Sequence, residues 1–170
     1  MDGIQATRET LGLVHEYLEA AIGDCEPETL VRTFPGATIG SIISIYMHAL
    51  SSEDWTLQEL IQGRQKLFVT DKWSEKWGLP PVSQGEDIDW TTANVPLAEV
   101  QKYAQAVYAA TNEWLSSATD ASLDQQIDWF NNQKKAAGWV IADTIHVHLP
   151  FHAGEISSLK GLMGLKGLPW

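Results

Sequence analysis

The chain has 170 residues, of which 44% are hydrophobic and 19% charged, and its formal net charge is -11 at pH 7. This length suits one domain spanning 1–170 with a buried core, and the composition excludes general disorder. The acidic balance argues against a nucleic-acid partner, because the 11 Lys and Arg residues form no basic stripe. The chain has no signal-like N-terminus and no apolar run long enough to span a bilayer, so we expect a cytoplasmic protein without a membrane partner.

Apolar residues at spacings of three and four predict helices in the first part of the chain. The expected helical ranges are about 6–22, then 37 or 38 to about 50, and then 54–63, with a short segment over 28–32. From 63 to 96 the periodicity fades, although three tryptophans lie there. A segment of this length within a compact domain is usually functional or covers part of the core.

The second half of the chain begins with the clearest helix, over 97–117, for which Asn94 is the expected cap. Residues 123–138 are ambiguous and are compatible with a small hairpin. The last helix is expected over about 139–164. The fold class is therefore all-α: a four-helix bundle with a long crossover between its second and third helices.

The last helix carries the strongest local motif. His148 and His152 are four residues apart, so they share one helix face and can reach one first-row metal ion. Glu155 falls on the same face, whereas His146 points nearly the opposite way and is excluded as a ligand. Two histidines at this spacing are more often ordinary core or surface residues. Here the surrounding helix is otherwise apolar, so buried imidazoles require partners.

His48 is the third candidate ligand. It lies on a line of mostly small polar residues on the second helix, made by Ser41, Ser44, His48, Ser52 and Trp55. Short polar side chains around a histidine are typical of a cavity wall that leaves room for a ligand. His15 and Tyr108 are weaker candidates for the same site, and a core position is the ordinary interpretation of both.

Pro150 leaves two alternatives for the geometry of this motif. A proline inside a helix removes one N–H donor and clashes with the preceding turn, at a cost of about 3 kcal/mol. Either the helix bends at this point and re-aims His148 relative to His152, or a new helix begins at Pro150. The second alternative would remove the spacing argument.

These motifs resemble the DinB/YfiT-like metalloenzyme family over most of the chain. The resemblance includes a histidine late in the second helix followed by Glu53-Asp54-Trp55, the long crossover, and the helix from Tyr103 to Leu115. Its most specific part is His148-x-x-x-His152-x-Gly154-Glu155-Ile156, which leads to Leu159-Lys160-Gly161. Many family members have Arg where this chain has Ala153, so any activity that relies on that cation is in doubt.

The resemblance implies a four-helix bundle in which His48, His148 and His152 hold a divalent metal ion, and dimers are common in the family. Some members are transferases or isomerases that use a low-molecular-weight thiol, and others have no known activity. Three imidazoles would leave coordination positions open for water or a small-molecule substrate. Zinc, nickel and iron are all compatible with imidazole ligands.

Two functional hypotheses follow. In the first, the chain is a metal-dependent enzyme, a thiol-dependent transferase or isomerase or a hydrolase, in which Glu155 orients a ligand imidazole or carries a proton. In the second, it is a non-catalytic, metal-stabilised bundle that binds a small ligand or a partner. A purely structural dimer would be favoured if the His48 face were packed shut.

Overall fold

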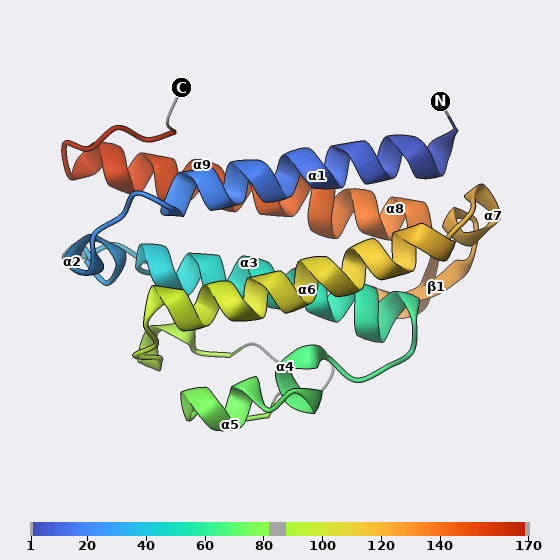
Figure 1. Ribbon diagram of the computed structural model, residues 1–170, viewed down its shortest axis with the longest axis horizontal. Helices are drawn as coiled ribbons and strands as arrows, with labels where there is room; N and C mark the ends of the chain where they lie inside the picture. Colours follow the sequence, from blue (N-terminus) through green and yellow to red (C-terminus); the bar gives the residue numbers. More distant parts are fainter. Residues whose placement is uncertain (1, 82–87, 169–170) are drawn as a thin grey trace.

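The architecture is a bundle of four long helical segments, as the sequence predicts (Figure 1). The computed structural model describes residues 2–81 and 88–168. The first three long segments are α1 (Gly3–Ile22), α3 (Ile42–Asp54) with its π-helical continuation η1 (Trp55–Ile61), and α6 (Leu97–Ser117). The last segment consists of α8 (Ala137–Ile141), the π-helical η4 (Ala142–Val147) and α9 (His148–Leu162). Short helices α2 (Pro27–Leu30) and α7 (Asp120–Leu123) connect the ends of the bundle.

The crossover between η1 and α6 determines the direction of the third long helix. In Figure 1, α3 and α6 run in the same direction, so the chain must return along the bundle between them. It does so through α4 (Leu67–Thr70), α5 (Trp73–Trp77) and the 3-10 turn η2 (Trp90–Thr92). The three tryptophans of the crossover pack against the hydrophobic core of the bundle: Trp73, Trp77 and Trp90. Trp73 and Trp90 are buried.

Helix boundaries depart from the sequence prediction at three places. The first helix begins earlier than expected because the Asp2 carboxylate accepts a hydrogen bond from the backbone N–H of Gln5. The second helix begins at Ile42, and the prediction of a start near residue 37 or 38 was wrong. The β-branched Thr38 and Ile39 and the following Gly40 are poor helix formers, and Ser41 takes the cap position. At the third helix, Pro96 is the cap residue rather than Asn94.

Pro150 neither breaks the last segment nor begins it. The backbone is helical from Ala137 to Leu162, and Pro150 is the third residue of α9. The six residues immediately before α9 form the π-helical turn η4, in which the hydrogen-bond register is shifted. Because the missing N–H of a proline disturbs the register of the turn before it, we attribute η4 to Pro150. His148 and His152 therefore keep their spacing on one helix face.

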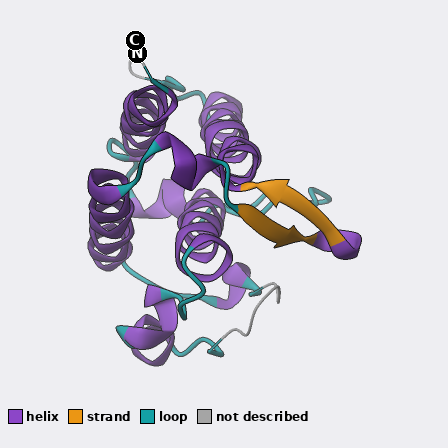
Figure 2. Ribbon diagram, turned by 90° about the vertical axis from the view of Figure 1, so that its right-hand side faces the viewer, coloured by secondary structure: helices purple, strands orange, loops and turns teal. Residues whose placement is uncertain are grey.

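The ambiguous segment before the last helix contains an antiparallel hairpin. Strand β1 (Gln126–Trp129) pairs with β2 (Gln133–Ala136), with Trp129 opposite Gln133. The turn between them places Asn131 and Asn132 at a φ of 58°, a left-handed conformation that asparagine tolerates well. The hairpin projects from the side of the bundle (Figure 2).

Asp54 fastens the crossover to the bundle. Its buried carboxylate accepts hydrogen bonds from the backbone N–H groups of Leu67 and Phe68, at 3.0 and 2.9 Å, and from the Tyr103 hydroxyl at 2.7 Å. Burial raises the pKa of Asp54 to about 6, against the opposing effect of these hydrogen bonds and of Lys66. Lys66 is also buried, its ammonium donates to the Ser51 hydroxyl, and burial lowers its pKa.

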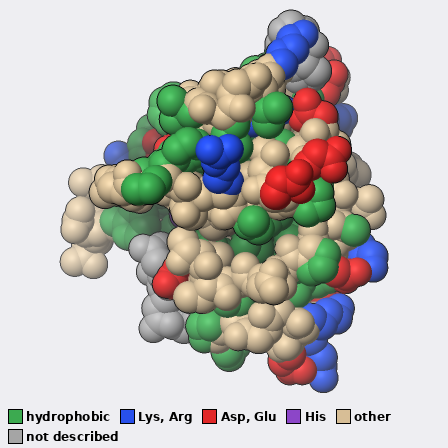
Figure 3. All heavy atoms as spheres, turned by 90° about the vertical axis from the view of Figure 1, so that its left-hand side faces the viewer, with side chains coloured by type: hydrophobic (Ala, Val, Ile, Leu, Met, Phe, Trp, Pro, Cys, Tyr) green, Lys and Arg blue, Asp and Glu red, His purple; other side chains and the backbone are tan. Residues whose placement is uncertain are grey.

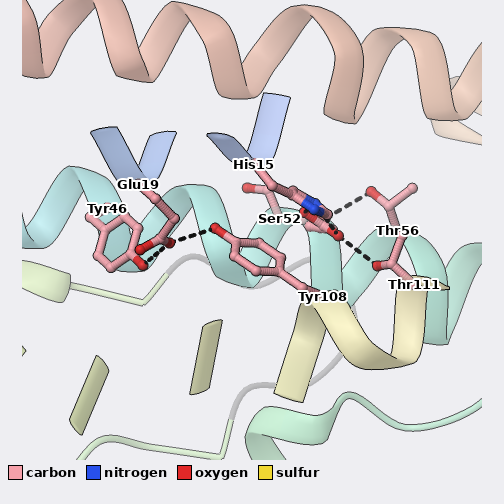
Figure 4. A network of polar contacts seen from close by, with 8 residues as sticks. His15, Glu19, Tyr46, Ser52, Thr56, Tyr108 and Thr111 are labelled. Carbon is pink, nitrogen blue, oxygen red and sulfur yellow. Dashed lines mark hydrogen bonds and ion pairs between the residues drawn. The ribbon is translucent and has the colours of Figure 1, made fainter. Parts of the chain in front are cut away.

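A polar network crosses the interior between α1, α3 and α6 (Figure 4). The Glu53 carboxylate is fully buried, lies 2.9 Å from the His15 ring nitrogen and accepts a hydrogen bond from Thr111. The Tyr108 ring stacks on His15, and its hydroxyl donates to Glu19, as does that of Tyr46. Charged groups inside a bundle are tolerated only when they are paired in this way.

The outer surface mixes charges of both signs. Figure 3 shows the end of the bundle that carries α2 and α5, where acidic and basic side chains are interspersed and no histidine is visible. In the described part of the chain, no helix has both the length and the apolar character that crossing a membrane requires.

Candidate metal centre

The structure brings His48, His148 and His152 together. Each offers a ring nitrogen, and these nitrogens all lie within 4.8 Å of one another. The His48 ring centroid lies 5.2 Å from that of His148 and 4.9 Å from that of His152, with nearly perpendicular planes in both cases. No other group of three potential ligands of this kind occurs among the residues described. The three imidazoles are therefore close enough to hold one metal ion.

The side chains of the two α9 histidines face each other. Their Nε2 atoms are 2.8 Å apart, and Nδ1 of His152 lies 2.6 Å from the Glu155 carboxylate. If Nδ1 of His152 donates its proton to Glu155, its Nε2 presents a lone pair toward His148. Two imidazole nitrogens this close need either an N–H of one ring that donates to the other or a metal ion between them.

The two α9 nitrogens fit a divalent ion with a small adjustment. A tetrahedral zinc ion holds nitrogen ligands at about 2.0–2.1 Å, which places them about 3.3 Å apart. The separation of 2.8 Å between the two α9 nitrogens would have to widen by about half an ångström. Rotation of the imidazole rings about their side-chain bonds supplies a movement of this size.

The electrostatics of the site keep His148 neutral. Burial, together with the neighbouring His152 and His48 rings, lowers the pKa of His148 to about 4. A hydrogen bond to the backbone of Thr144 and the Asp143 carboxylate act in the opposite direction. A neutral imidazole has a free lone pair, which is the form that a metal ion binds.

Two pockets flank the three histidines. One, of about 290 Å³, is lined by His48, His152 and Glu155 together with Ser44, Asp89 and Trp90. The other, of about 310 Å³, is lined by His148, Ser52, Trp55 and a group of mostly apolar residues. The polar line predicted on the second helix thus borders both pockets, with Ser44 and His48 at one and Ser52 and Trp55 at the other. The His48 face is therefore not packed shut.

The remaining histidine candidates lie elsewhere. His15 pairs with Glu53 inside the bundle and is not part of the three-histidine group. His146 is also outside the group, its Nε2 is buried without a hydrogen-bond partner among the described residues, and burial lowers its pKa. The Tyr108 hydroxyl is engaged by Glu19.

Sequence reasoning missed several residues around the site. Asp89 and Trp90 come from the crossover, and Trp129 and Phe130 come from the hairpin. No periodic pattern marks these residues, because they reach the pockets only through the packing of irregular segments on the bundle. The aromatic residues concentrated in both segments were the only sequence feature that could have indicated a contribution to the pockets.

Among the groups that make the stability of the metal-free protein depend on pH, His148 and Asp54 have large pKa shifts that act in opposite directions. The pKa of His148 is about 4 in the folded protein and about 6.5 in the unfolded chain. Between these two values the unfolded chain binds a proton at His148 that the folded protein does not, so the free energy of unfolding rises with pH. The pKa of Asp54 is about 6 in the folded protein and about 4 in the unfolded chain. Between these two values the folded protein keeps a proton on Asp54 that the unfolded chain releases, so the free energy of unfolding falls with pH. Compared with wild type, Asp54→Asn should therefore show a steeper rise with pH, and His148→Ala a weaker rise or a fall.

Urea unfolding in the presence of a chelator, at several values of pH in this window, measures these slopes. Glu75→Gln is the matched control, because the Glu75 side chain is 71% exposed and the variant should keep the wild-type slope. Identical slopes in wild type, Asp54→Asn and His148→Ala would contradict the assignment.

Comparison with known proteins places the fold but leaves the activity open. No family model matches the chain. One curated protein, the structure-specific endonuclease subunit slx1 of Talaromyces marneffei, is 31% identical over 107 residues, which are 62% of this chain and 26% of that protein. The chain thus spans about a quarter of the length of that relative.

Solved structures resemble the whole chain. A conserved protein from Enterococcus faecalis has a TM-score of 0.77 and 19% sequence identity, with 96% of this chain and 99% of that chain covered. A DinB-like protein, YjoA, from Bacillus subtilis has a TM-score of 0.56 and 17% identity, with 99% of this chain and 96% of that chain covered. At these identities the likeness concerns the fold. With its helix order, long crossover and bundle all matching the expectation from the sequence, the chain has the DinB-like fold.

Proposed function

We propose that the chain binds one divalent metal ion through His48, His148 and His152 and is a metal-dependent enzyme that acts on a small molecule. The observation that carries the proposal is the convergence of three imidazole nitrogens from α3 and α9 within 4.8 Å, beside two pockets. Three protein ligands with a remaining open position are typical of catalytic zinc sites, whereas structural sites use four.

The residues around the metal position have separate roles in this proposal. When bound, a divalent ion supplies Lewis acidity, which lowers the pKa of water or of a thiol and polarises a carbonyl. Glu155 holds the Nδ1 side of His152 and so aims its Nε2 at the metal position. Because Glu155 also lines a pocket and its side chain is 42% exposed, it can take a proton from a substrate there.

The reaction class has two candidates, transfer or isomerisation with a low-molecular-weight thiol, and hydrolysis. Zinc, nickel and iron are the candidate metals, and a cytoplasmic homodimer is the proposed form of the protein. The alternative is a metal-stabilised bundle without catalytic activity that binds a ligand or partner. A nuclease role by analogy with the fungal endonuclease subunit is disfavoured by the net charge of -11.

Metal content and coordination test this proposal. Elemental analysis of untagged protein is expected to find a stoichiometric divalent metal, and the double variant His148→Ala/His152→Ala is expected to lack it. In Co²⁺-loaded protein, the visible spectrum should change when a small neutral thiol, 2-mercaptoethanol, is added, because the thiol enters an open coordination position. Metal binding without a spectral change would favour the non-catalytic alternative. Absence of metal, even after incubation with zinc or nickel, would contradict the metal site itself.

A further inference from the structure

The second of the two pockets that flank the histidines, the one beside His148, is lined mainly by aromatic side chains. It has a volume of about 310 Å³. The hairpin contributes Trp129 and Phe130, η1 contributes Trp55, and the last helical segment contributes Val147 and Phe151. We propose that this pocket binds the apolar, aromatic body of an uncharged or cationic small molecule, and that in the metal-free protein it selects against carboxylates and phosphates.

Three aromatic rings form one preorganised wall of this pocket. The Phe130 ring stacks on Trp55 at a centroid distance of 5.9 Å and an angle of 27°. Trp129 contacts Phe130 edge to face at 4.8 Å and also packs against Trp139 at 5.5 Å. The hairpin turn that carries Phe130 is thus held against the bundle by ring contacts, which makes the wall rigid.

The side of the pocket formed by the last helical segment includes exposed apolar side chains. Phe151 is 68% exposed and Val147 46%, and Phe130, which lines the same pocket, is 57% exposed. Large apolar side chains that gather around a concave site are typical of ligand-binding surfaces. An engineered cavity of about 150 Å³ holds benzene, so a pocket of about 310 Å³ has room for a ring system with a substituent.

In the metal-free protein, the charges around the three histidines select against anions. None of the residues described as lining the two flanking pockets is Lys or Arg. The acidic side chains there are Asp143 in the aromatic pocket and Asp89 and Glu155 in the other. A carboxylate that entered the aromatic pocket would lose hydration and meet Asp143 without a compensating cation.

The orientation of a bound ligand follows from the position of His148. This histidine lines the aromatic pocket, and it is also one of the three that converge on the proposed metal position. A ligand whose ring packs on Phe130 and Phe151 can therefore direct its polar end toward that position. This statement about the polar end rests on the proposed function, whereas the shape of the pocket does not. The selection against anions concerns the metal-free protein, because a divalent ion beside His148 would add positive charge.

Three probes with the same ring and different heads test the proposal: 4-fluorobenzyl alcohol, 4-fluorobenzylamine and 4-fluorobenzoate. Binding to metal-free protein, kept in chelator, is measured by fluorine NMR. We expect the alcohol and the protonated amine to bind at least about tenfold more tightly than the benzoate. Phe151→Ala is expected to weaken binding of the alcohol about tenfold. Leu162→Ala is the matched control, because Leu162 lies on the same helix, is 70% exposed and does not line the pocket.

Several outcomes would overturn the proposal. Equal affinity for the alcohol and the benzoate would contradict the charge selection, and an equal loss in Phe151→Ala and Leu162→Ala would contradict the location. Sedimentation of the same samples shows whether a second copy covers the pocket. If wild type is a dimer that binds no probe, and Phe151→Ala dissociates this dimer, the pocket is part of a subunit interface. Metal content is measured separately on the same variants purified without chelator, so failure of the metal site is distinguishable from failure of the pocket.

Discussion

Replacement of His48 with alanine is expected to weaken zinc binding by about a hundredfold or more. The binding free energy of zinc at structural sites with four ligands is about 10–16 kcal/mol, or about 3 kcal/mol for each ligand. A loss of about 3 kcal/mol corresponds to about two orders of magnitude in affinity. His48 is the sole member of the group contributed by α3, since His148 and His152 both belong to α9. Without His48, only two ligands remain, both on one helix, and two ligands do not form a stable metal site.

Competition with a chelator of known zinc affinity measures this loss. His146→Ala is the matched control, because His146 lies two residues from His148 but outside the three-histidine group, and zinc affinity should be unchanged in this variant. Glu155→Gln should give an intermediate loss of about tenfold, since Glu155 holds His152 and is not itself in the group. Equal losses in the His48 and His146 variants would contradict the proposed ligand set.

The variant Asp54→Ala is expected to lower the free energy of unfolding by about 3–5 kcal/mol. The change removes the acceptor of two backbone N–H groups at the start of α4 and of the Tyr103 hydroxyl, all of which then lack a partner. It also removes a carboxylate that favours the charged form of the buried Lys66. A buried charge without its partner is among the largest single causes of destabilisation.

Chemical denaturation of a double-mutant cycle separates these two contributions. Lys66→Met removes the buried charge, so the double variant Asp54→Ala/Lys66→Met should lose less than the sum of the two single losses. Asp71→Ala is the control within the same crossover, where the carboxylate is exposed and the expected change is within about 0.5 kcal/mol. A loss in Asp54→Ala no larger than that of the control would show that Asp54 does not hold the crossover in place.

Much of the architecture could be predicted from the sequence because its signals are local. The stripe on α6 predicted its bounds of Leu97–Ser117, and the polar line on α3 predicted a cavity wall that the structure contains. The start of α3 could not be placed, since residues 37–41 are compatible with both helix and turn until their packing is known. Pro150 was undecidable for the same reason, because the π-helical turn that accommodates it involves residues as far back as Ala142.

By itself, the sequence determined the helical class, the order of the elements and the face that His148 shares with His152, because helical periodicity relates residues within a few positions of one another. Only the tertiary structure decided that His48 meets this pair, that His15 pairs with Glu53 instead, and that the hairpin places Phe130 beside His148. These distances join residues far apart in the chain, and they depend on how the helices and the hairpin pack. Packing is set by the whole core at once, so no local pattern contains it.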